Sequence, residues 1–139
     1  MTVDPALITL HRYYIWANRM RTHFDDLLEK EGYQTTRGEI ESFLYMSYWY
    51  GGLYVVIEGW QELKLREPTI DRLLDSPNVD LLRRYRNGVF HFQSDYSDDR
   101  FTDFMHEGKH AVQWVRDLTL HLGRYFLQRF RPEVYGALP

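Results

Sequence analysis

Apolar residues recur at helical spacing along the N-terminal part of this chain. Asp4 can cap the free amides of a helix, and Pro5 fits its first position. Apolar positions then recur at intervals of three, four and seven residues, namely Leu7, Leu10, Tyr14, Ala17, Phe24 and Leu28. Gly32 is a suitable stop signal. The pattern predicts a first long amphipathic helix from Pro5 to just before Gly32.

A second long helix is predicted from Thr36 to about Leu65. Thr36 and Glu39 have the spacing of a capping box, and Pro68 marks the end of the segment. Apolar residues run almost all the way round this helix, which is typical of a helix at the centre of a domain. Three glycines interrupt it: Gly51, Gly52 and Gly59. Because glycine weakens a helix and has no side chain, we expect neighbouring helices to approach closely there.

The rest of the pattern predicts two more long helices and a short one. A helical turn fits residues 69–74, and a helix runs from the Ser-Pro pair at 76–77 to about Phe92. After a polar loop, a last helix begins at Asp99 and ends before Pro132. Its apolar face is predicted to contain Phe101, Met105, Val112, Val115, Leu118, Leu122 and Phe126. No strand-like alternation competes, so we expect one domain over residues 1–139, an all-α, antiparallel four- to five-helix bundle.

Size, composition and charge narrow the functional classes. The chain has 139 residues, no cysteine and a formal net charge of −3. The lack of cysteine excludes disulfides, thiolate zinc sites and cysteine nucleophiles, and the negative charge disfavours nonspecific coating of nucleic acid. The N-terminus lacks the features of a secretory signal. The tyrosine-rich run 42–58 ends in the charge of Glu58, which favours a buried helix over a membrane span. We therefore expect a cytoplasmic protein without a membrane partner.

The segment RNGVFH at residues 86–91 carries the most distinctive chemistry. One face of its helix is apolar and must meet the core, namely Leu82, Tyr85, Val89 and Phe92. Asn87 and His91 are one turn apart on the outward face, and the long side chain of Arg86 reaches the same surface. Gly88 adds no side chain to that surface, which suggests that a ligand or another backbone approaches closely there.

Arg86, Asn87 and His91 resemble the hallmark of the HEPN superfamily (higher eukaryotes and prokaryotes nucleotide-binding). That hallmark is an Arg followed after four to six residues by a His, often with Asn directly after the Arg. The resemblance implies a HEPN-like bundle that forms a homodimer, with the two motif helices facing each other across a cleft. In many members it also implies a metal-independent ribonuclease or toxin activity without a cofactor. Arg83 and Arg84 form a local basic patch that would support phosphate binding.

The chemistry of these three residues suits RNA cleavage. A histidine can exchange a proton near neutral pH, so His91 would take one from a ribose 2′-hydroxyl or give one to the leaving oxygen. Arg86 would hold the phosphate and stabilise its developing charge, while Asn87 would orient either group. A second function stays open, because other HEPN-like domains are noncatalytic modules that bind nucleotides or protein partners, including minimal nucleotidyltransferase antitoxins.

Two further patterns point to metal chemistry. His106, Glu107 and His110 fit the HExxH pattern of zinc proteases, in which two histidines one turn apart bind the metal. The two residues between Glu107 and His110 are Gly108, which weakens a helix, and the charged Lys109, whereas zinc proteases usually have uncharged residues at these two positions. The first helix and the same histidine pair also resemble DinB-like bundles, which bind a metal through three histidines, so that His11 or His23 would supply the third. We prefer the HEPN resemblance and a site without metal.

Glu58 and His121 are isolated polar residues on largely apolar helices. Such residues are usually satisfied core or interface groups. Glu58 can alternatively pair with Arg86 and fix its orientation. We therefore expect the Glu58 and Arg86 side chains to lie within salt-bridge distance.

Overall fold

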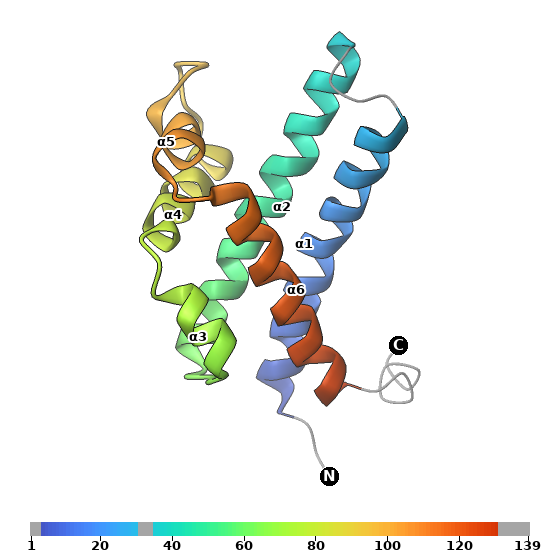
Figure 1. Cartoon of the computed structure of the whole chain (residues 1–139), viewed down its shortest axis with the longest axis vertical. Coiled ribbons are helices and arrows are strands. Elements are labelled where there is room, and N and C mark those ends of the chain that lie inside the picture. The colour runs from blue at the N-terminus through green and yellow to red at the C-terminus, as the bar shows by residue number, and fades with distance from the viewer. Residues whose placement is uncertain (1–3, 31–34, 131–139) are drawn as a thin grey trace.

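Helices make up all the regular structure in the part of the chain that the computed structural model describes, residues 4–30 and 35–130 (Figure 1). Within these ranges they are α1 (Pro5–Lys30), α2 (Thr36–Glu62), α3 (Pro68–Leu74), α4 (Asn78–Phe90), α5 (Asp99–Glu107) and α6 (Ala111–Arg129). α1 and α2 form a long antiparallel pair. α4 packs against α2, α5 packs against α4, and α6 crosses in front of the pair. The all-α prediction is confirmed, with two helices where the sequence predicted a single last one.

The predicted starts of the first two helices are nearly correct. The Asp4 carboxylate accepts a hydrogen bond from the backbone N–H of Ala6 at 3.0 Å, so α1 begins as expected. α2 is capped one residue earlier than predicted. The hydroxyl of Thr35, not that of Thr36, accepts from the backbone N–H of Gly38 at 2.9 Å. The expected stop at Gly32 lies outside the described residues.

Two glycines allow α1 and α2 to pack closely, as the sequence predicted. A β-carbon on Gly52 would lie 3.1 Å from the β-carbon of Ala17, and one on Gly59 would overlap the side chain of Leu10. Both partners belong to α1. The backbone of α2 can approach α1 this closely only because glycine has no side chain.

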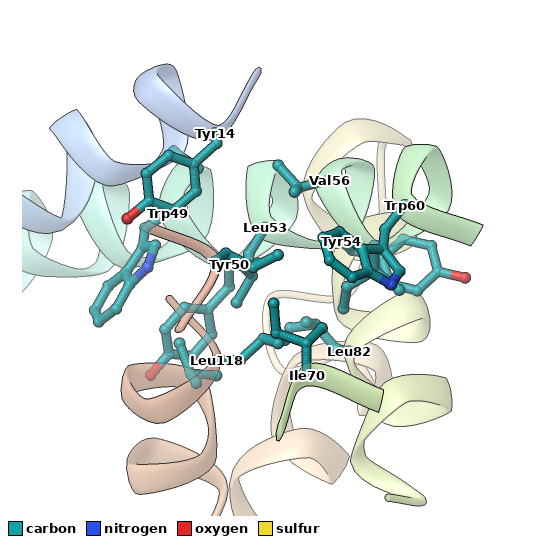
Figure 2. Packing of buried hydrophobic residues seen from close by; sticks show 14 of the residues in the cluster. Tyr14, Trp49, Tyr50, Leu53, Tyr54, Val56, Trp60, Ile70, Leu82 and Leu118 are labelled. Atoms are coloured by element: carbon teal, nitrogen blue, oxygen red, sulfur yellow. The ribbon is translucent and has the colours of Figure 1, made fainter. Parts of the chain in front are cut away.

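The hydrophobic core is centred on α2. Six of its side chains are at most 2 % exposed: Trp49, Tyr50, Leu53, Val56, Ile57 and Trp60. Figure 2 shows Ile70 of α3, Leu82 of α4 and Leu118 of α6 converging on this helix. Fully burying an aliphatic or aromatic side chain contributes about 1.5–3 kcal/mol, so this central helix supplies much of the stability. None of the helices in the described ranges is long and apolar enough to cross a membrane.

The predicted last helix is broken between residues 108 and 110. His110 has a left-handed backbone (φ 49°), which a continuous helix does not permit. The buried side-chain amide of Asn78 donates to the carbonyl of Lys109 at 2.9 Å and accepts from its N–H at 3.0 Å. These two bonds replace the helical hydrogen bonds that the break removes. The prediction was wrong because the contact comes from α4, which a pattern within one segment cannot reveal.

Candidate functional site

Arg86 projects from α4 toward α2. Its Nη1 lies 2.7 Å from Oε1 of Glu58, so the predicted salt bridge is confirmed. Its guanidinium carbon also lies 4.9 Å from the ring centroid of Tyr54. Burial, together with the charge of Glu58, raises the pKa of Tyr54. Only 23 % of the Arg86 side chain is exposed, so the guanidinium is held at the surface in a fixed position.

Asn87 is joined directly to Arg86. Its Oδ1 accepts a hydrogen bond from Nε of Arg86 at 3.0 Å. The guanidinium is therefore held on one edge by the carboxylate of Glu58 and on another by the amide of Asn87. These contacts place two of the three expected site residues together on the surface of α4.

His91 is not on the helix. α4 ends at Phe90, and His91 has an extended backbone (φ −123°, ψ 127°). Its backbone N–H donates to the carbonyl of Asn87 at 3.0 Å, and its side chain is exposed. The prediction that Asn87 and His91 stand one turn apart on one helical face is thus wrong, although the two residues remain neighbours through the backbone.

The predicted core face of α4 is observed within the helix but not beyond its C-terminal end. Leu82 and Tyr85 are fully buried, as expected, and Val89 is half-buried. Phe92 was expected in the core but is 94 % exposed, because the helix has already ended. Gly88 is also explained differently. A β-carbon there would lie 3.1 Å from the ring of Phe101, so the close neighbour is α5 and not a ligand.

The two other arginines of α4 are both paired. Arg83 bridges Asp80 of its own helix at 2.8 Å, and Arg84 bridges Asp103 of α5 at 2.5 Å. Arg84 therefore extends toward α5, whereas Arg86 extends toward α2. The structure does not bring Arg84 together with Arg86, and the phosphate-binding role of Arg83 and Arg84 stays a prediction.

An aromatic groove that sequence reasoning missed lies beside the end of α4. Its volume is about 330 Å³, and its rings come from three helices: Tyr13 and Trp16 of α1, Tyr48 of α2 and Phe90 of α4. These four side chains are 38–55 % exposed. Phe90 is the last residue of α4 and directly precedes His91 in the chain, although His91 does not line the groove. Tyr13 and Trp16 fall outside the apolar stripe of α1, and that was the signal available in the sequence.

The histidines of the two metal hypotheses are dispersed. His106 lies in the last turn of α5 and His110 precedes α6, so the break after Glu107 removes the shared helical face that HExxH requires. His11 stacks on Phe126, with ring centroids 4.6 Å apart, and burial lowers its pKa to about 4. His23 stacks on Tyr45. Within the described ranges, no three His, Asp or Glu side chains are grouped so that they could hold a metal ion. His121 is half-buried on α6.

Comparison of the chain with protein-family models, with curated proteins and with solved structures gave no match. The HEPN resemblance therefore depends on Arg86, Asn87 and His91 and on the helical architecture alone.

Proposed function

We propose that this protein is a HEPN-like, metal-independent endoribonuclease of the toxin type, acting through Arg86, Asn87 and His91 in a homodimer. One observation carries the proposal. A guanidinium is fixed at the surface of α4 by Glu58 and Asn87, and an exposed histidine directly follows the C-terminal end of the same helix. A fixed cation and an exposed proton carrier are the two groups that phosphodiester cleavage needs.

Arg86 is suited to hold a phosphate group. Glu58 uses Nη1 and Asn87 uses Nε, and a guanidinium has five N–H donors, so donors remain for phosphate oxygens. The tight positioning also means that little rotational freedom is lost on binding. Glu58 is 46 % exposed, so water screens its attraction and an incoming phosphate can compete with it.

His91 is suited to the proton transfer. Its side chain is exposed, whereas its backbone is anchored to Asn87, so the imidazole can reach a substrate without unfolding α4. In the proposed reaction one His91 removes the proton of the ribose 2′-hydroxyl. The oxygen then attacks the adjacent phosphorus, the bond to the 5′-oxygen breaks, and the His91 of the second subunit protonates that oxygen. A cyclic phosphate and a free 5′-hydroxyl are the products.

The aromatic groove supports the proposed dimer. Its exposed rings form an apolar surface that includes Phe90, the residue before His91, and covering such a surface is favourable by about 25 cal/mol per Å². Sedimentation velocity should give about twice the monomer mass of 16.9 kDa. Trp16→Ala should weaken the dimer. Phe92→Ala, which removes a ring that is 94 % exposed and does not line the groove, should leave it intact.

Cleavage of RNA in the presence of EDTA tests the activity. The wild-type chain should cleave, and His91→Ala should slow cleavage 10²–10⁴-fold because it removes the general acid and base. Arg86→Lys should slow it less than Arg86→Ala, since lysine keeps the charge but loses the guanidinium geometry. His106→Ala is the matched control, because it removes an exposed histidine from the end of α5. Equal rates for His91→Ala and His106→Ala would refute the proposal.

A noncatalytic partner-binding module is the second candidate, and the pairing of Arg86 with Glu58 favours it. A paired guanidinium can be structural, while the aromatic groove provides a contact surface. In that case wild type and His91→Ala both leave RNA intact. A minimal nucleotidyltransferase co-expressed with the chain would then copurify with wild type and with His91→Ala, but not with Trp16→Ala.

A further inference from the structure

A second groove lies between α1 and α6. Its volume is about 460 Å³, which is within the range of small-molecule sites. α6 crosses α1 here (Figure 1), and Gly123 permits the approach, because a β-carbon at that position would overlap the hydroxyl of Tyr14. That hydroxyl donates to the carbonyl of Thr119 at 2.9 Å and so fixes the floor of the groove.

Three arginines line this groove, and no acidic residue does. Arg21 of α1 and Arg116 of α6 both bridge Asp25, at 2.8 Å and 2.7 Å. Arg124 of α6 lies on the rim, exposed, and forms no ion pair within the described ranges. Asp25 therefore holds the guanidiniums of Arg21 and Arg116, and Arg124 presents a third guanidinium to the groove. The chain as a whole carries −3, so this concentration of positive charge is local.

The other half of the groove is aliphatic. Leu120 and Leu127 line it and are 50 % and 68 % exposed. Leu120 follows Arg116 by four residues, and Leu127 follows Leu120 by seven. These spacings keep the three side chains on the same side of α6. Arg124 also lines the groove and stands between the two leucines in sequence, so cationic and aliphatic side chains alternate along α6.

We propose that the groove between α1 and α6 binds a small amphiphile with one anionic head group and an aliphatic body. The head group, a carboxylate or a phosphate monoester, pairs with Arg124, since the planar fork of arginine matches both anions. The aliphatic body covers Leu120 and Leu127. This site is separate from Arg86 and His91, and it does not depend on the proposed nuclease activity.

Calorimetric titration of the full chain tests the proposal, with decanoate and decyl phosphate below their micellar concentrations and decanol below its solubility limit. The two anions should bind, and the tighter of them identifies the head group. Decanol has the same aliphatic body without the charge and should bind at least tenfold more weakly. Arg124→Ala should weaken binding of the better anion about tenfold. Arg19→Ala is the matched control, because Arg19 is an exposed arginine of α1 that does not line the groove.

A second measurement locates the bound molecule. In ¹H–¹⁵N spectra the amide signals that shift on adding the anion should belong to α1 and α6 around Gly123, and Leu127→Gln should reduce the shifts without changing the melting temperature. Three results would overturn the proposal. The first is no binding of either anion, the second is equal loss of affinity in Arg124→Ala and Arg19→Ala, and the third is shifts confined to the aromatic groove between α1 and α2.

Discussion

The hydrogen bonds of Asn78 are predicted to hold the break between α5 and α6 in place. This side chain is 1 % exposed, and it both donates to and accepts from the backbone of Lys109. Asn78→Ala removes both bonds at once. The substitution leaves the rest of α4 unchanged, so it isolates the contribution of this contact to stability.

The magnitude follows from the two bonds. A typical hydrogen bond contributes about 1 kcal/mol net, and the cost rises when the abandoned partner is shielded from water. Lys109 is exposed, so water can reach its backbone after the substitution. We therefore expect the free energy of unfolding to fall by about 2 kcal/mol. For a chain of this length that corresponds to a decrease of about 7 °C in Tm.

Urea unfolding followed by far-UV circular dichroism measures this change. The midpoint should shift while the dependence on urea concentration stays the same, because the fold itself is preserved. Asn87→Ala is the matched control. It makes the same substitution in the same helix, so any gain in helix propensity is shared, but it removes only one half-buried contact with Arg86. If Asn78→Ala is no less stable than Asn87→Ala, the proposed role of Asn78 is wrong.

Three further changes test the electrostatics of the fold. Glu58→Gln should lower the free energy of unfolding by less than 1 kcal/mol, because the Arg86 pair is partly exposed; a loss above 2 kcal/mol would contradict this. Burial lowers the pKa of His11 to about 4, so its contribution to stability is complete above pH 6.5 and is lost as the pH falls toward 4. His11→Phe should therefore lose less stability than wild type between pH 7 and pH 4 in urea titrations, and an identical loss would refute the assignment. Burial raises the pKa of Tyr14 to about 12, so its contribution is complete below pH 10 and is lost as the pH rises toward 12. Tyr14→Phe should cost about 1 kcal/mol at pH 7 through the lost hydrogen bond to Thr119, and absorbance at 295 nm should show one fewer late-titrating tyrosine.

Local signals in the sequence predicted most helices because the physical cause is also local. Asp4 caps α1 through the next residues of the chain, and Gly52 and Gly59 permit close packing wherever a partner helix lies. The last helix was mispredicted for the opposite reason. Met105 and Val112 were expected on one buried face, but they are 38 % and 47 % exposed, because the break reorients α6 relative to α5. The residue that stabilises the break, Asn78, is 31 positions away from Lys109.

The same distinction applies to the sites. The Glu58–Arg86 pair could be predicted from the sequence because Glu58 is an isolated charge in the apolar part of α2, and a half-buried charge needs a partner. The position of His91 could not, because a helical wheel assumes that the helix continues, whereas α4 ends at Phe90. The groove between α1 and α6 was out of reach for a further reason. Arg116 is 91 residues from Asp25, and their separate helices meet only because Gly123 has no side chain to keep Tyr14 away. A helical wheel shows only which residues of one helix share a face, whereas this groove is formed by two helices. The charges that line it can therefore be identified only once the packing of α1 against α6 is known.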